Sequence, residues 1–298
     1  MYSRPRKLVN KNLTFTCREA SAILGSASHG PQRGVSMPSI EVPHGRLHYE
    51  IHGQGRTLAL LHGMWSNKGV WRRVVPELAK NNEVILLDHM GHGESDRMRV
   101  PYSLATYASD LGHLLDSLEK SQVILVGFSL GASVAQEAYF QNPSRVTGLV
   151  LIATPPPYKL HWTVGISLVS LLEKLGITSL KKQTIKALGR RYSKGTDKRF
   201  IEKSLNELDA YDDDEFSRLL RSAWVRGNIG REAEIRVPTL LVIGEKDRII
   251  SHSVSMEQAI PGSRLSVIPD CDHSVLFDRP ELVIPEILGF LGEVPPNP

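Results

Sequence analysis

Three residues in this sequence are of the types that nucleophilic catalysis requires: Ser129, Asp247 and His273. A serine hydroxyl is a poor nucleophile at neutral pH and needs an adjacent base. Histidine suits that role because its ordinary pKa is about 6.5. A carboxylate beside the imidazole fixes the tautomer of the ring and stabilises its positive charge. Together the three groups would attack an acyl carbon and form a covalent acyl-serine.

The residues around Ser129 predict a strand, a tight turn and a helix. Residues 123–126 are consecutive apolar residues typical of a buried strand, and residues 130–140 have helical periodicity. The glycines on both sides, in Gly-Phe-Ser-Leu-Gly (127–131), favour this corner because a Cβ on either would crowd it. Ser129 would then lie at a helix N-terminus, which favours developing negative charge. The alternative is that Ser129 is only the N-cap of that helix.

The rest of the chain alternates short apolar runs with amphipathic segments. The first two runs are separated by His44-Gly45 and predict a hairpin. Beyond it, the alternation predicts an α/β fold with a mostly parallel sheet and helices on both faces. The expected strands are 39–42, 46–52, 57–61, 83–87, 123–126, 146–153, 239–243 and 264–268, and the expected helices are 67–79, 104–118, 130–140 and 274–291.

The candidate functional groups all follow predicted strands. His62-Gly63, Asp88, Ser129, Asp247 and His273 each come directly after or shortly after one. The carboxyl ends of parallel strands meet at one edge of a sheet, where α/β proteins bind their ligands. We therefore expect these groups to lie at the same edge, which favours Ser129 as a nucleophile over a simple cap.

Residues 155–235 interrupt the alternation and contain no predicted strand. An insertion at the carboxyl end of a strand would cover the site, so we predict a helical cap. Residues 181–203 carry nine Lys and Arg against two acids, and 212–215 form an acidic run. The basic stretch is either a solvated face paired with that run, or a rim that attracts an anionic substrate or a membrane surface. Its expected helices are 162–175, 180–188, 198–208 and 214–224.

Several motifs occur together in an order that resembles the α/β-hydrolase fold superfamily over residues 39–293, and most closely its capped esterase and lactonase branch. The resemblance implies a triad in the order Ser129, Asp247, His273. It also implies an oxyanion hole formed by the backbone N–H groups of Met64 and Leu130. The matching motifs are His62-Gly63, Asp88-x-x-Gly91-x-Gly93-x-Ser95, Gly127–Gly131, Gly244-x-x-Asp247 and His273.

The resemblance implies a hydrolase that cleaves a carboxylic ester or lactone through an acyl-serine, with a small hydrophobic substrate of short to medium length and no cofactor. A carbon–carbon bond hydrolase or a cofactor-free perhydrolase would use the same triad, and a receptor or signalling protein of this fold would bind a ligand without turnover. Epoxide hydrolases and haloalkane dehalogenases are disfavoured because that branch has an Asp nucleophile where Ser129 stands.

Other residues have more than one interpretation. Trp65, Phe128 and Trp162 either line an acyl pocket or belong to the core. His62 is expected to shape its loop and Asp88 to stabilise a turn. His89 and His92 flank a glycine turn, but no third ligand at a recognisable spacing supports a metal site. Three acids are alternatives to Asp247 as the partner of His273, namely Glu245, Asp270 and Asp272.

Composition limits the classes of function. The 298 residues are 41% hydrophobic and 23% charged, which is ordinary for a soluble globular protein. The net charge is +4, but residues 1–36 alone carry six Lys and Arg against one Glu, so the remainder is close to neutral. A nucleic-acid surface on the folded part is therefore not expected. No apolar run approaches the ~18 residues of a membrane span.

We divide the chain into a basic extension (1–36), an α/β core (37–154 and 236–298) and the cap (155–235). We expect the extension to be disordered or weakly ordered and to lie outside the folded domain. It could alternatively be an Arg- and Ser-rich transit peptide for an organelle, or a segment that precedes a true start at Met37. One of the two cysteines, Cys17, lies in it, so a structural disulfide is not expected. A reducing, cytoplasmic location follows, with an organelle as the alternative.

Overall fold

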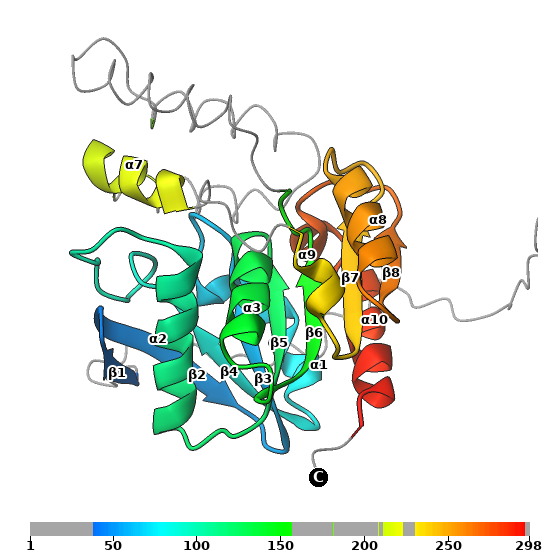
Figure 1. Cartoon of the computed structure of the whole chain (residues 1–298), viewed down its shortest axis with the longest axis horizontal. Helices are drawn as coiled ribbons and strands as arrows, with labels where there is room; N and C mark the ends of the chain where they lie inside the picture. Colours follow the sequence, from blue (N-terminus) through cyan, green and yellow to red (C-terminus); the bar gives the residue numbers. More distant parts are fainter. Residues whose placement is uncertain (1–37, 157–180, 182–207, 209–210, 223–229, 296–298) are drawn as a thin grey trace, which may run out of the picture. The chain divides into compact units, whose positions relative to one another are not determined.

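The computed structural model describes residues 38–156, 181, 208, 211–222 and 230–295. Within them, eight strands form one sheet in the order β1-β2-β4-β3-β5-β6-β7-β8 (Figure 1). β1 pairs with β2 and β2 with β4 in antiparallel fashion, and the other neighbours are parallel. The strands are β1 (Ser39–Val42), β2 (Gly45–His52), β3 (Arg56–Leu61), β4 (Asn82–Leu87), β5 (Val123–Phe128), β6 (Val146–Ile152), β7 (Thr239–Gly244) and β8 (Arg264–Ile268).

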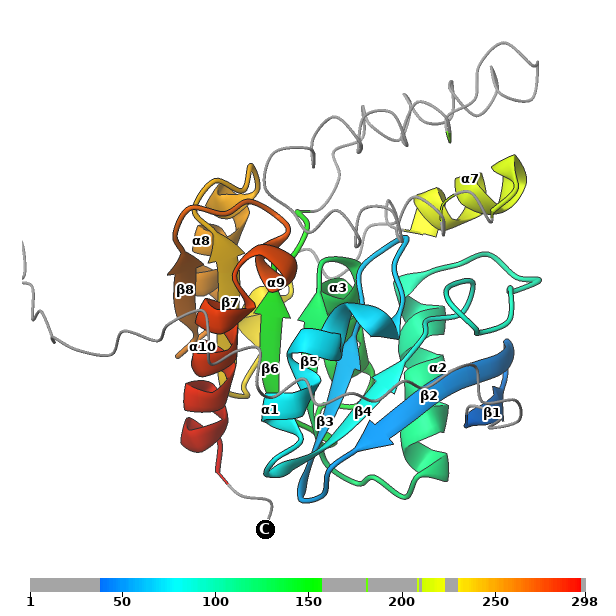
Figure 2. The same cartoon turned by 180° about the vertical axis from the view of Figure 1, so that it is seen from behind.

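Helices cover both faces of this sheet (Figures 1 and 2). α2, α3 and α8 lie on one face, and η1, α1, α9 and α10 lie on the other. The predicted α/β class is therefore confirmed. The helices are η1 (Lys68–Arg73, 3₁₀), α1 (Val75–Leu78), α2 (Leu104–Ser117), α3 (Leu130–Gln141), α7 (Asp213–Ser222), η2 (Glu232–Glu234, 3₁₀), α8 (Ile250–Ala259), α9 (Val275–Asp278) and α10 (Pro280–Glu293).

The central strand β5 shows why this sequence forms a two-sided sheet. All six of its residues are buried. Because successive side chains of a strand point to opposite faces, Val123 and Leu125 enter the core under α2 and α3. Ile124 and Val126 enter the core on the opposite face. An unbroken apolar run is thus what a strand covered by helices on both faces requires.

Two predicted helices are each divided in the structure, and a proline accounts for both divisions. The segment expected as a helix over 67–79 is a 3₁₀ helix followed by α1, with Pro76 in the first turn of α1. The helix expected over 274–291 breaks at Arg279, whose backbone has φ −137° and ψ 45°, and α10 restarts at Pro280. Proline lacks an N–H and disfavours helical geometry in the residue before it. Helix α8 was not predicted.

The expected cap is described only in part. The helix predicted over 214–224 is present as α7. The three helices predicted over 162–175, 180–188 and 198–208 lie outside the described residues, apart from Lys181 and Leu208. The division into extension, core and cap therefore stays a prediction. In the described part of the chain, no helix is both long and apolar enough to cross a bilayer.

Candidate active site

Ser129 lies on a strained corner between β5 and α3. Its backbone has φ 52° and ψ −116°, a conformation that residues other than glycine rarely adopt. The corner is as tight as predicted, because a Cβ on Gly131 would lie 2.1 Å from the carbonyl oxygen of Leu61. The Ser129 side chain does not cap α3. Its Oγ instead lies 3.0 Å from Nε2 of His273, so the interpretation as a simple N-cap is wrong.

His273 connects Ser129 to Asp247. Its Nδ1 lies 2.8 Å from Oδ2 of Asp247, whose side chain is only 1% exposed. The second carboxylate oxygen of Asp247 accepts the N–H of Ile249 at 3.2 Å. A carboxylate can only accept, so this pattern places a proton on Nδ1 and leaves Nε2 free to accept the serine proton. The His273 side chain is 23% exposed, which leaves it accessible to a substrate.

The three alternative acids bind elsewhere. Asp270 forms an ion pair with Lys246 at 2.9 Å, and its own N–H donates to Glu245 at 3.1 Å. Asp272 accepts the N–H of Ser274 at 3.1 Å. Each carboxylate thus has a partner in its own loop, and Asp247 is the acid that the structure places against His273.

The two segments expected to carry the oxyanion hole flank Ser129. A Cβ built on Gly63 would lie 3.3 Å from Cβ of Ser129, so this part of the loop after β3 lies against the serine. Met64 follows Gly63, and Leu130 is the first residue of α3. The first N–H groups of a helix have no acceptor within it. Met64 and Leu130 thus lie on segments that flank Ser129, and their role as oxyanion donors stays a prediction.

His62 holds the loop that carries Met64. The ring is fully buried, its Nδ1 donates to the carbonyl of Gly63 at 2.7 Å, and its Nε2 accepts the N–H of His89 at 2.9 Å. Burial lowers the pKa of His62 more than the nearby Asp88 raises it. The ring is thus neutral with the proton on Nδ1, and it shapes the loop as expected.

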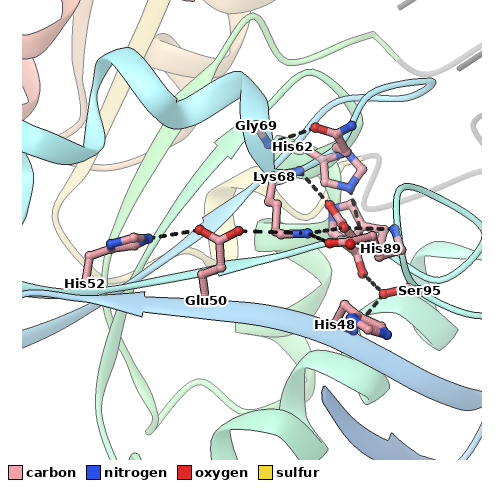
Figure 3. A network of polar contacts seen from close by, with 11 residues as sticks. His48, Glu50, His52, His62, Lys68, Gly69, His89 and Ser95 are labelled. Carbon is pink, nitrogen blue, oxygen red and sulfur yellow. Dashed lines mark hydrogen bonds and ion pairs between the residues drawn. The ribbon is translucent and has the colours of Figure 1, made fainter. Parts of the chain in front are cut away.

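Asp88 stabilises the turn after β4, as predicted, and has a partner that the sequence analysis missed. The fully buried carboxylate accepts the N–H of Glu94 at 3.0 Å, and both the N–H and Nζ of Lys68, each at 2.7 Å. Figure 3 shows Lys68 within this network. A lysine normally indicates a solvated charge, and Lys68 lies 20 residues from Asp88, so no local pattern indicated the pair.

Three residues were expected either to line an acyl pocket or to belong to the core, and the two that the structure describes, Trp65 and Phe128, both pack in the hydrophobic core. The Phe128 ring centroid is 5.5 Å from that of His273. Trp65 follows Met64 and stacks on Phe216 of α7, with centroids 5.1 Å apart and planes 14° apart. Trp162 lies outside the described residues. The contact of Trp65 with α7 was not predicted, and its part in a pocket stays a prediction.

Polar contacts hold α7 against the loop before α2. The hydroxyl of Tyr102 donates to Glu215, and Arg218 donates to the carbonyls of Met98 at 2.6 Å and Val100 at 2.9 Å. Burial and the bond to Glu215 raise the pKa of Tyr102. These partners are more than 100 residues apart in sequence. They fix the helix that carries the partner of Trp65.

His89 and His92 pack with His62 as a cluster of rings. The His62 centroid is 4.5 Å from that of His89 and 5.2 Å from that of His92. Burial lowers the pKa of His92 to about 3 and that of His89 well below its ordinary value. Among the described residues, no group of three or more His, Cys, Asp or Glu side chains is placed to hold a metal ion.

The chain is similar in sequence and in structure to known hydrolases. The model of the alpha/beta hydrolase family matches residues 58–286. A 2-hydroxymuconate semialdehyde hydrolase of Pseudomonas sp. is 30% identical and covers 83% of this chain and 91% of its own. A pimeloyl-[acyl-carrier protein] methyl ester esterase of Nitrosospira multiformis is 26% identical, with 82% and 97% covered. Among solved structures, a thermophilic esterase from Thermogutta terrifontis has a TM-score of 0.75 at 23% identity, with 86% of this chain and 99% of its own covered.

Proposed function

Because the chain belongs to the alpha/beta hydrolase family, we propose that it is a serine hydrolase that cleaves a carboxylic ester or lactone through an acyl-serine intermediate. One observation carries the proposal. His273 contacts Oγ of Ser129 at 3.0 Å through one ring nitrogen and Oδ2 of Asp247 at 2.8 Å through the other. A nucleophile, a base and an orienting acid are thus connected in the order that acyl transfer requires.

In the proposed acylation step, Nε2 of His273 accepts the Ser129 proton as Oγ attacks the substrate carbonyl. The carbonyl oxygen becomes an oxyanion, which the N–H groups of Met64 and Leu130 stabilise. Asp247 stabilises the imidazolium. The tetrahedral intermediate then collapses, and Nε2 donates its proton to the leaving alcohol oxygen.

Deacylation repeats the same proton transfers with water as the nucleophile. Nε2 of His273 accepts a proton from water, and the hydroxide adds to the acyl carbon. The second tetrahedral intermediate expels Oγ of Ser129, which regains its proton from the imidazolium. The chain's own residues supply each group that these two steps use.

The described surroundings favour a hydrophobic substrate. Phe128 lies beside His273, and Trp65 follows the proposed donor Met64. Apolar walls of this kind suit an acyl or alcohol group of short to medium length. The methyl ester esterase among the relatives is consistent with this class of bond.

Cleavage of a carbon–carbon bond is the second candidate function. It is favoured by the 30% identity to a 2-hydroxymuconate semialdehyde hydrolase. The same triad would serve, but the group that leaves would be a carbon atom instead of an alcohol oxygen. The two candidates therefore differ in substrate and not in the residues that they need.

Hydrolysis of p-nitrophenyl esters of increasing acyl length tests the proposal. We expect multiple turnover that Ser129→Ala abolishes. Ser255→Ala is the matched control, because Ser255 is exposed on α8, and it should leave the rate unchanged. Absence of ester turnover, combined with labelling of Ser129 by a fluorophosphonate, would reject the ester assignment. A panel of diketones would then test carbon–carbon cleavage.

A further inference from the structure

The loop that carries Met64 is attached at both ends to one neighbouring segment. We call residues 62–68 the oxyanion loop and residues 88–95 the β4 loop. At the first end, Nε2 of His62 accepts the N–H of His89 at 2.9 Å. At the second end, Lys68 binds Asp88. Met64 lies between these attachments, so its position depends on both.

Lys68 binds the β4 loop through its backbone and its side chain together. Its N–H donates to Oδ1 of Asp88 at 2.7 Å, and its Nζ donates to Oδ2 of the same carboxylate at 2.7 Å. Nζ also donates to Glu94 at 2.5 Å. Two bonds from one residue to one carboxylate fix both the place and the direction of the backbone at residue 68.

The ion pair between Lys68 and Asp88 is buried in the protein interior. Its side chain is 9% exposed and that of Asp88 is 0% exposed. Burial by itself would raise the pKa of Asp88, but the hydrogen bonds from Lys68 and Glu94 help to lower it. A buried carboxylate without a cation is strongly unfavourable. Lys68 supplies the positive charge that lets Asp88 stay ionised at this depth.

The middle of the oxyanion loop needs such support. Trp65 has φ 53°, in the left-handed region that a residue with a bulky side chain rarely adopts. An oxyanion donor must lie about 2.7–3.1 Å from the oxygen atom, so a displacement of about 1 Å removes most of its effect. Anchors on both sides of Met64 and Trp65 keep this conformation in place.

We propose that Lys68 is a positioning residue for the oxyanion hole, and that its ion pair with Asp88 holds the Met64 N–H in place for the reaction at Ser129. The inference rests on the proposed function. Lys68 does not contact the reacting atoms. It acts through Asp88 and the oxyanion loop, so its removal should weaken the transition state and leave substrate binding largely intact.

Lys68→Met is the principal variant, because it keeps the length of the side chain and removes its charge. We expect kcat to fall about 10- to 100-fold, where the larger value approaches the effect of losing one oxyanion donor. KM should change by less than about threefold. The rate of inactivation by a fluorophosphonate should fall in parallel. Lys80→Met is the matched control, since Lys80 forms an exposed pair with Glu77 at 2.6 Å, and it should behave as wild type.

The pH profile separates this role from a merely structural one. Without Lys68, the pKa of Asp88 should rise. The loss of kcat in Lys68→Met relative to wild type should therefore become larger as the pH is lowered from 9 to 6. The other titratable groups around the pair are Glu50, His62, His92 and Glu94. Lys68 also lowers the pKa of His62, so its loss should raise that pKa in the variant as well. A difference between the two profiles therefore reports the loss of the Lys68 charge from this group.

Lys68→Gln keeps the test decisive if Lys68→Met does not fold, because its amide still donates to Asp88 while the charge is absent. A folded Lys68→Met or Lys68→Gln protein with wild-type kcat and inactivation rate would overturn the inference, as would a rise in KM alone. If wild type cleaves no ester but reacts with the fluorophosphonate, the ester proposal fails and the inactivation rates still decide the role of Lys68. A wild type that shows neither reaction overturns both.

Discussion

Acid should destabilise this protein through its buried histidines. His92 is 1% exposed, and its Nδ1 contacts the carbonyl oxygen of Met90 at 3.2 Å. Burial, together with repulsion from the adjacent His62, lowers the pKa of His92 from 6.5 to about 3. The unfolded chain therefore binds a proton below pH 6.5 that the folded state takes up only near pH 3, so the free energy of unfolding falls as pH falls through this window.

The size of the effect follows from the two pKa values. At pH 8 the imidazole is neutral in both states and contributes nothing to the difference. At pH 5 the unfolded state is protonated and the folded state is not, which destabilises the native protein by about 2 kcal/mol for pKa values of 6.5 and about 3. Burial also lowers the pKa values of His62 and His89, which adds to the effect in the same direction.

Urea denaturation at pH 8 and at pH 5 measures this difference directly. His92→Gln should reduce the loss of unfolding free energy between the two pH values by about 2 kcal/mol, whatever its effect at pH 8. His113→Gln is the control, because His113 is exposed on α2, and it should leave the pH dependence unchanged.

The reasoning fails if wild type and His92→Gln lose the same free energy between pH 8 and pH 5. Equal losses would mean that His92 is accessible to protons in the native state or that another group dominates. A changed m-value at pH 5 would mark a departure from two-state unfolding, and the comparison would then use the pH range where the m-values agree.

Three further predictions concern the site and its frame. Gly131→Ala should reduce folded protein or abolish activity, because the added Cβ would lie 2.1 Å from a backbone oxygen of β3. Gly112→Ala should instead stabilise α2 by up to about 1 kcal/mol, because nothing lies within 4 Å of the added Cβ. Thermal unfolding measures both effects. Asp247→Asn should lower kcat about 10⁴-fold with little change in KM, since the amide no longer selects the productive tautomer of His273; a drop below tenfold contradicts the assignment. Burial raises the pKa of the Cys271 thiol to about 11. In a variant that lacks the other cysteine, a thiol reagent at pH 8 should therefore react slowly with the native protein and rapidly with the unfolded protein. Rapid reaction of the native protein would contradict this.

The parts of the fold that the sequence predicted are those with local patterns. The unbroken apolar run before Ser129 and the glycines around it define a strand, a corner and a helix within about 20 residues. The three residues proposed as a triad could be expected at one edge of the sheet, because each lies beyond a predicted strand and parallel strands bring their carboxyl ends together. The structure places the three side chains in contact through the hydrogen bonds of His273 to Ser129 and Asp247, and their catalytic roles stay a prediction.

The features that the sequence did not predict depend on distant partners or weak patterns. Lys68 is buried against Asp88, which lies 20 residues away in sequence, and Tyr102 contacts Glu215 across 113 residues. Neither pairing leaves a trace in spacing or periodicity. Helix α8 has little amphipathic contrast, since only Ser253 and Met256 among its residues are buried. The break before Pro280 did have a local signal, namely the restriction that proline places on the residue before it.

The order of strands has a consequence for refolding. The hydrogen bond between His273 and Ser129 closes across 144 residues, and His273 follows β8, which pairs with β7 at the end of the sheet. Contacts of such long sequence separation form late, because the chain loses much entropy in closing the intervening loop. Edge strands also open at a lower free energy than the centre of a sheet. Recovery of activity after denaturation should therefore lag behind recovery of secondary structure, and mild denaturant should release the His273 loop while β5 and its serine are still folded.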